Sequence, residues 1–116
     1  MEQSRWMRSM LLDVYGALLT EKQRECYDLH FNEDLSLSEI AEQSGISRQG
    51  VWDNIRRAEA ALLEIEAKTG LVRRMERTKQ AMEEIRRQAK ALEESAEDRT
   101  RDIAGRILQE IDRLED

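Results

Sequence analysis

One glycine, Gly45, separates two stretches of sequence that each begin like a helix. Before it, Ser36 and Glu39 have the Ser-x-x-Glu spacing of a capping box. After it, Ser47 is a favourable N-cap residue for a second helix. Because glycine adopts a positive φ at little cost, Gly45 can end the first helix and turn the chain sharply. The stretch therefore predicts two helices joined by a tight turn.

The residues around this turn have the spacing of a helix-turn-helix motif. Ala41 is a small residue on the first helix, Gly45 lies in the turn, and Val51 is a β-branched residue on the second helix. The small residue lets the two backbones approach, and the β-branched residue locks the second helix onto the first. Spacings of four, three and four predict the buried face of the second helix, which consists of Val51, Ile55, Ala58 and Leu62.

Polar and aromatic side chains remain on the outward face of this second helix. In helix-turn-helix proteins the corresponding side chains reach base edges, and the amide groups at the helix start favour a phosphate. We predict a nucleic-acid-binding site that consists of Ser47, Arg48, Gln49, Trp52, Asp53, Asn54, Arg56 and Arg57. Arginine and glutamine can make bidentate contacts with bases, and the Ser47 hydroxyl can contact a phosphate.

The alternative is a three-helix core whose arginine face is only solvated. For Trp52 the two interpretations are equal: its ring fits stacking on a base, and it also fits packing on a neighbouring helix or a second copy. The net charge of −6 argues against generic, charge-driven binding to nucleic acid. Residues 48–57 contain three arginines, Arg48, Arg56 and Arg57, and one acid, Asp53. The predicted phosphate-binding surface is therefore positive but small.

The rest of the chain is typical of an all-α protein. Its 116 residues include no proline and 5 glycines, while residues of high helix propensity dominate. Thr20 and Gln23 form another capping box, which predicts a helix from about Glu21. In this helix we expect Cys26 in the core and His30 as a packed or capping residue. An earlier helix is predicted from the spacing of Trp6, Met10, Leu11, Val14, Leu18 and Leu19.

Beyond Gly70 the apolar pattern becomes that of a long amphipathic helix. An apolar stripe persists for about three heptads, as in a coiled coil, with Thr78 in one gap: Leu71, Met75, Met82, Ile85, Ala89, Leu92 and Ala96. Such a helix must bury its stripe on the first domain or on another chain. The register shifts near Asp98, and a last amphipathic helix is predicted from Ile103, Ile107, Ile111 and Leu114.

We therefore predict a helix-turn-helix domain at residues 1–69 and a helical tail at residues 70–116. For the tail we favour self-association, which makes the protein a homodimer, over a solvated helix that merely extends the core. A dimer would present two recognition helices to one ligand.

Several classes of function find no support in the sequence. It contains no Gly-rich phosphate loop, no Ser/His/Asp or Cys/His set beyond single copies, and no metal-ligand spacing. We therefore expect no catalytic site, no metal site and no cofactor. No apolar run approaches the roughly 20 residues that span a bilayer, and the first residues do not resemble a signal peptide. We expect a cytoplasmic protein that does not bind membranes.

Residues 6–66 resemble the YlxM family of bacterial helix-turn-helix proteins, whose genes commonly sit beside those for the signal recognition particle protein and its receptor. The most specific matches are LTEKQR, SLSEIAE and SRQ-x-V-x-DNIRR, at Leu19–Arg24, Ser36–Glu42 and Ser47–Arg57. Gly50 and Trp52 depart from the alanine and tyrosine that relatives often have. More distantly, the region resembles the promoter-reading fourth region of sigma factors.

The resemblance implies a regulatory role in the signal recognition particle pathway, with DNA or the particle's small RNA as the ligand. The alternative is a protein-interaction module, whose acidic helical body and paired tail bind a basic partner such as a protein of the particle. The charge favours the second interpretation and the motif favours the first. We favour the first.

Overall fold

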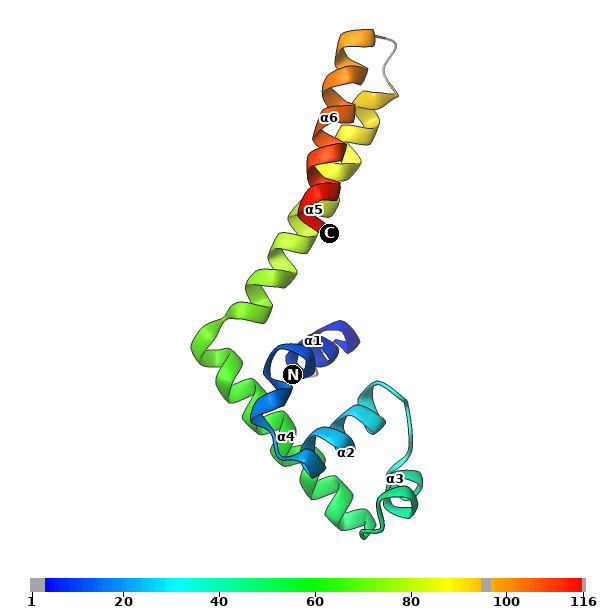
Figure 1. Cartoon of the computed structure of the whole chain (residues 1–116), viewed down its shortest axis with the longest axis vertical. Coiled ribbons are helices and arrows are strands. Elements are labelled where there is room, and N and C mark those ends of the chain that lie inside the picture. Colours follow the sequence, from blue (N-terminus) through cyan, green and yellow to red (C-terminus); the bar gives the residue numbers. More distant parts are fainter. Residues whose placement is uncertain (1–3, 95–96, 116) are drawn as a thin grey trace. The chain divides into compact units, whose positions relative to one another are not determined.

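The computed structural model describes residues 4–94 and 97–115, which form six α-helices and one short 3₁₀ helix and no strand (Figure 1). The predicted all-α fold is confirmed. The helices are α1 (Arg5–Tyr15), η1 (Gly16–Leu18), α2 (Glu21–Phe31), α3 (Leu37–Ser44), α4 (Arg48–Thr69), α5 (Leu71–Glu93) and α6 (Asp98–Glu115). The chain divides into two compact units, Met1–Arg73 and Arg74–Asp116, so that α5 begins in the first unit and continues into the second.

Helix α4 is the centre of the first unit, because it contacts α1, α2 and α3. The predicted buried face of α4 is confirmed: Val51, Ile55, Ala58 and Leu62 are all buried. Two apolar clusters form around it. The first joins α4 to α1, α2 and the start of α5 through Leu11, Tyr15, Tyr27, Ala58, Leu62 and Val72. The second joins α4 to α2 and α3 through Cys26, Ile40, Val51 and Ile55. Cys26 is therefore a core residue, as predicted.

The predicted helix starts are confirmed by their hydrogen bonds. Thr20 forms a complete capping box with Gln23, and Ser36 forms one with Glu39. The Ser47 hydroxyl accepts a hydrogen bond from the Gly50 amide at 3.0 Å. These side chains satisfy backbone groups that a helix start would otherwise leave without partners. Because each cap is made within four residues, the starts of α2, α3 and α4 depend on local sequence alone.

The prediction for the end of the first helix was wrong at Leu18, which is 68% exposed. The chain leaves the α-helix at Gly16 and continues as the 3₁₀ helix, which has about three residues per turn. This change of period turns Leu18 away from the apolar face. Tyr15, which the apolar spacing did not include, is buried in its place.

A buried carboxylate joins α4 to the start of α5. Glu66 Oε1 accepts hydrogen bonds from the Tyr15 hydroxyl at 2.7 Å and from the Val72 amide at 3.0 Å, and Oε2 accepts one from the Arg73 amide at 3.0 Å. The Tyr15 hydroxyl also contacts Thr69 Oγ1. Burial raises the pKa of the Glu66 carboxyl, but the hydrogen bonds from Arg73, Tyr15 and Val72 lower it more, so the pKa lies below its ordinary value.

In the second unit α5 and α6 run side by side as a helical hairpin (Figure 1). Arg86 of α5 donates hydrogen bonds to Asp112 at 2.9 Å and to Glu115 at 2.7 Å, both on α6. Among the residues of this unit that the structure describes, few apolar side chains are buried; these are Ala89, Ala104 and Ile111. Several residues of the predicted stripes stay between 47% and 76% exposed, namely Ile85, Leu92, Ile103 and Leu114.

The predicted stripe of α5 also differs from the structure at its ends. Val72 is buried, whereas Leu71 is exposed, so the stripe meets the core one residue later than its spacing indicated. Ala96, the last residue of the predicted stripe, lies outside the described residues.

Candidate nucleic-acid interface

The eight predicted site residues occupy the first three turns of α4, with Ser47 as its N-cap. At about 100° of rotation per residue, Gln49, Asp53, Arg56 and Arg57 lie farthest from the buried face. The same rotation puts Arg48 and Trp52 on one flank of the helix and Asn54 on the other. Arg48 and Trp52 of the first flank line a shallow hollow together with Gln49 and with Leu37 of α3.

The turn between α3 and α4 has the geometry that the sequence predicts. Gly45 has a φ of +69°, and its amide donates to the Ala41 carbonyl oxygen at 3.0 Å. A Cβ atom at Gly45 would meet nothing within 4 Å, so the requirement for glycine is the left-handed backbone and not lack of space. The turn allows α3 and α4 to pack through Ile40, Val51 and Ile55. The N-terminal turn of α4 stays at the surface.

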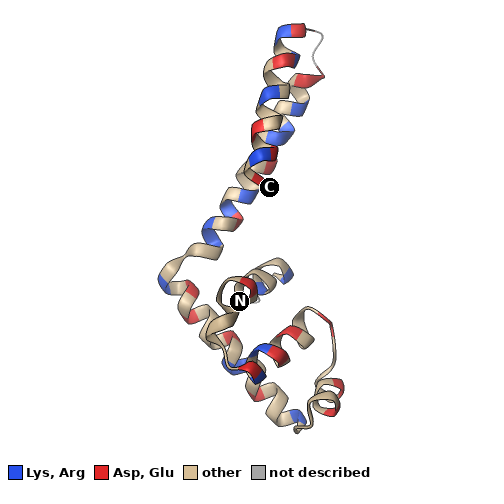
Figure 2. Cartoon of the chain, viewed as in Figure 1, with Lys and Arg blue, Asp and Glu red and all other residues tan. Residues whose placement is uncertain are grey.

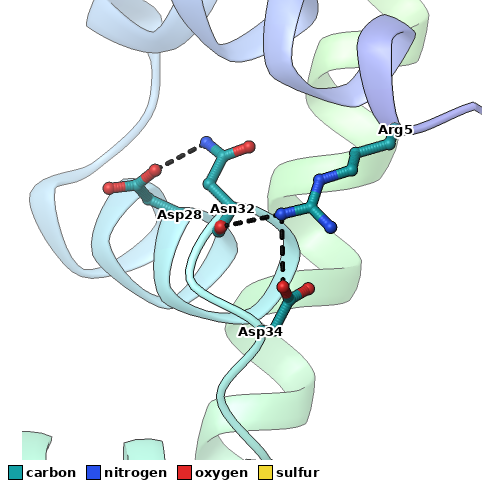
Figure 3. Close-up of polar contacts among 4 residues, drawn as sticks. All are labelled: Arg5, Asp28, Asn32 and Asp34. Carbon is teal, nitrogen blue, oxygen red and sulfur yellow. Dashed lines mark hydrogen bonds and ion pairs between the residues drawn. The ribbon is translucent and has the colours of Figure 1, made fainter.

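The loop that leads into α3 is tied to the start of α1 (Figure 3). The Arg5 guanidinium donates to the Asn32 carbonyl oxygen and to the Asp34 carboxylate, both at 3.2 Å. The Asn32 side chain in turn donates to Asp28 at 2.6 Å. Asp34 has a φ of +58°, a region that Asp adopts more readily than most residues. These contacts hold the segment from which the helix-turn-helix begins.

The arginines of the predicted site are unpaired within the described part of the chain. Among the residues that the structure describes, no hydrogen bond or ion pair involves Arg48, Arg56 or Arg57, and all three are exposed. Elsewhere the α-helices carry both signs of charge, except α3, whose charged residues are all acidic (Figure 2). The positive surface on α4 is therefore small, and its guanidinium groups are available to an external acceptor.

The other polar residues of the predicted site are partly occupied by internal hydrogen bonds. The Gln49 side chain donates to Asp53 at 3.2 Å. The Asn54 amide donates to the Gly50 carbonyl oxygen at 2.9 Å and is half-buried. Ser47 uses an oxygen lone pair for its cap, which leaves its hydroxyl hydrogen free to donate. Asn54 is thus the residue of the set that is least available to a ligand.

Trp52 is 40% exposed and lies between two hollows. One is the hollow beside Leu37, and the other is larger and lies between α1, α2 and α4. The larger hollow brings in side chains that the sequence did not indicate, Arg8 and Glu59. Their ion pair, at 3.9 Å, spans 51 positions, so no local pattern could have revealed it.

His30 also lines the larger hollow, and it is packed as the sequence predicted. Its Nδ1 lies 2.9 Å from the Leu35 carbonyl oxygen, and its ring meets the Phe31 ring edge-on at 4.9 Å between centroids. The contact with Leu35 joins the end of α2 to the loop before α3. His30 therefore has a structural role that its position alone explains.

The described helices contain no stretch that is long and apolar enough to cross a bilayer. Within the same residues, no three His, Cys, Asp or Glu side chains are grouped in a way that could hold a metal ion.

A tight glycine turn, a capped second helix and an exposed first turn rich in donors define a helix-turn-helix protein. The chain belongs to the family described as "Putative helix-turn-helix protein, YlxM / p13 like", whose model matches residues 2–103. This confirms the resemblance found in the sequence.

Individual relatives support this membership. A UPF0122 protein of Thermoanaerobacter sp. is 40% identical over 107 residues, which cover 91% of this chain and 92% of the relative. A UPF0122 protein of Acetivibrio thermocellus is 48% identical over 88 residues, covering 76% and 75%. One of Geobacillus kaustophilus is 53% identical over 76 residues, covering 66% and 69%. The similarity thus extends well beyond the helix-turn-helix motif.

Proposed function

We propose that this protein binds nucleic acid through the outward face of α4 and acts as a regulatory protein in the signal recognition particle pathway. The observation that supports the proposal most is the set of three exposed arginines, Arg48, Arg56 and Arg57, which have no partner among the described residues. Some other exposed arginines of the described chain pair with acids, as Arg87 does with Glu84, and others do not, so these three are distinguished by their shared place on the outward face of α4. Unpaired guanidinium groups suit phosphate and base edges, and Arg48 also lies beside the N-terminus of α4.

The spacing of these side chains suits a groove. Arg48, Trp52 and Arg56 follow one another at intervals of four residues, so they form a strip about 12 Å long along α4. An α-helix fits the major groove of B-form DNA, and exposed arginine and aromatic side chains also suit the unpaired bases of RNA. The pathway itself enters the proposal through the family resemblance, and both DNA and the particle's RNA are its candidate ligands.

A salt titration tests the proposal. Purified protein is titrated against two labelled ligands, the DNA upstream of its own gene and the signal recognition particle RNA. If the three arginines contact phosphates, log affinity should fall against log salt concentration with a slope of about −2 to −3. Preference for the upstream DNA would indicate transcriptional control, and preference for the signal recognition particle RNA would indicate a role in particle assembly. Absence of binding to both at low salt would contradict the proposal.

A second candidate function is a protein-interaction module that binds a basic protein of the signal recognition particle. The net charge of −6 favours it. In this function the acidic helical body and the tail after Gly70 provide the binding surface. Binding would then survive nuclease treatment and would be lost when the tail is removed, whereas binding to nucleic acid through α4 would be lost with the nuclease.

We also propose that the second unit associates with a second copy of the chain. Its hairpin buries few side chains and leaves Ile85, Leu92, Ile103 and Leu114 largely exposed, which is less burial than a stable hairpin needs. Residues 74–116 carry 10 Lys/Arg and 12 Asp/Glu, a balance of −2, so repulsion between two copies is weak. A four-helix arrangement would cover the exposed stripes.

Replacing Ile85 and Leu92 by aspartate should convert the dimer to a 13.6 kDa monomer, because two charges would enter the paired stripe. Sedimentation velocity measures the mass. The matched control is Gln80→Asp with Ala91→Asp, which adds the same charge at exposed positions on the opposite face of α5. A wild-type protein that is monomeric at all concentrations would contradict self-association.

A further inference from the structure

The larger hollow beside Trp52 has the composition of a binding pocket. It lies between α1, α2 and α4, has a volume of about 550 Å³, and is lined by Arg8, His30, Phe31, Trp52, Arg56 and Glu59 together with the core residue Ile55. All of these residues belong to the first compact unit. Two of them, Trp52 and Arg56, are also part of the outward face of α4, so the hollow is continuous with the candidate interface.

Arg8 is held in position but lacks a hydrogen-bond partner at one nitrogen. Its guanidinium lies over the Phe31 ring at 4.2 Å from the centroid, and its carbonyl oxygen accepts a hydrogen bond from the Tyr27 hydroxyl at 3.0 Å. Its Nε is buried without a hydrogen bond, because Glu59 Oε2 is 3.9 Å away. Buried polar groups are usually satisfied, so the Arg8–Glu59 pair is not complete by itself. Because Nε itself is buried, the capacity for a ligand lies in the Arg8 Nη nitrogens, which make no hydrogen bond within the described residues, and in the Glu59 carboxylate.

The other polar groups in the hollow add both donors and acceptors. Arg56 supplies a guanidinium without a partner in the described residues, and the Glu59 carboxylate can only accept. The His30 ring must carry its hydrogen on Nδ1, because the Leu35 carbonyl oxygen beside it can only accept. Its Nε2 is then an acceptor in the neutral ring. Flat rings, guanidinium donors and a carboxylate acceptor together match a planar ligand with mixed polar edges.

Guanine is the nucleobase that fits this set. Its O6 and N7 accept two hydrogen bonds from an arginine, and its N1–H and N2–H₂ donate to a carboxylate. Trp52 provides an exposed ring on which a base can stack. Because N1 and N2 are occupied in a base pair, only an unpaired guanine can use the carboxylate. We infer that the hollow binds one unpaired guanine of the nucleic acid that α4 contacts, with Arg8, Arg56 and Glu59 reading its edges.

This inference rests on the proposed binding of nucleic acid. The guanine site can be disproved while the binding of nucleic acid stands, so the experiment must distinguish the two. The probes are two labelled RNA hairpins, one with a single bulged guanine and one fully paired. We expect the wild-type protein to bind the bulged hairpin about tenfold more tightly, since one bidentate contact discriminates by that order. Hairpins with a bulged adenine, cytosine or uracil should bind like the paired one.

Glu59→Gln tests the carboxylate, and Glu64→Gln is its matched control. Glu64 lies on the same helix, is exposed and does not line the hollow. In E59Q the roughly tenfold preference for the bulged guanine should be lost. Affinity for the paired hairpin should stay within about twofold of the wild-type value. E64Q should keep the preference, and thermal unfolding verifies that both variants are folded.

Two outcomes would overturn the inference while nucleic-acid binding stands. One is equal binding of the bulged and paired hairpins by the wild-type protein, and the other is an unchanged guanine preference in E59Q. If neither hairpin, nor the upstream DNA, nor the signal recognition particle RNA binds at low salt, the proposed function fails and this inference fails with it.

Discussion

Replacement of both Arg48 and Gln49 by alanine is expected to weaken nucleic-acid binding by about 100-fold. Each bidentate contact to a base contributes roughly 1–3 kcal/mol of discrimination, and 1.4 kcal/mol corresponds to a tenfold change in affinity. Arg48 also lies next to the N-terminus of α4, where its charge adds to the attraction for a phosphate. Fluorescence anisotropy with the better of the two ligands measures the loss.

The fold should tolerate this double substitution. Arg48 makes no hydrogen bond in the described chain, and Gln49 makes one to Asp53 at 3.2 Å on the helix surface. Such a pair four residues apart contributes only about 0.2–0.5 kcal/mol, and alanine has a higher helix propensity than either residue. The midpoint of thermal unfolding should therefore change by less than about 3 °C.

The matched control is Arg99→Ala with Gln109→Ala. It removes the same residue types and the same charge from exposed positions on α6. If the control weakens binding as much as the α4 variant, the effect comes from total charge and not from α4. If the α4 variant keeps its affinity within about twofold, the outward face of α4 is not the interface, and the protein-interaction function gains support.

Glu66→Ala should lower the free energy of unfolding by about 3 kcal/mol. The carboxylate satisfies the Tyr15 hydroxyl and the amides of Val72 and Arg73. Alanine would leave the two amides without this acceptor and the Tyr15 hydroxyl with only its contact to Thr69 Oγ1, and each buried unsatisfied group costs about 1–3 kcal/mol. We expect the midpoint of thermal unfolding, followed by circular dichroism at the helix band, to fall by about 12 °C. Glu64→Ala, which removes only the exposed pair with Lys68, should cost less than about 1 kcal/mol.

The contribution of Glu66 should also depend on pH with a defined sign. Its pKa in the folded protein is lowered below the ordinary 4.5, so the ionised form stabilises the fold. This stabilisation is complete above the pKa of the unfolded chain and is lost as the pH falls through the lower pKa of the folded protein. Glu66→Gln cannot ionise, so its deficit in unfolding free energy should be constant above about pH 6 and shrink below pH 4.5. A deficit that is equal at pH 7 and pH 3.5 would contradict this role of the charge.

The parts of the fold that were predictable are those set by neighbours in sequence. The caps at Thr20, Ser36 and Ser47 use partners three residues away, and the turn at Gly45 needs only one residue with a positive φ. The buried face of α4 follows from helical periodicity. The prediction for Leu18 was wrong because the chain changes to a 3₁₀ helix there, so the α-helical period used for the prediction no longer applies.

The features that the sequence did not reveal depend on contacts across the fold. Glu66 looks like one acid on a charged helix, and its burial depends on Tyr15, which is 51 positions away. Arg8 and Glu59 come together across the same separation. The exposed side chains of the candidate site were predictable as a set, because once the buried face of α4 is known, the residues on its other faces are expected to be exposed. The internal hydrogen bond of Asn54 was not predictable, since it depends on the choice of one side-chain rotamer.

The capping of α4 has a consequence for how this surface can evolve. The helix starts where it does because of Gly45 and Ser47, and it packs through Val51 and Ile55. Neither the start of α4 nor its packing depends on the exposed side chains Arg48, Gln49 and Arg56. Selection can therefore replace the exposed residues of α4 one at a time without a penalty in folding, so descendants could acquire new ligand specificities while they inherit the same architecture.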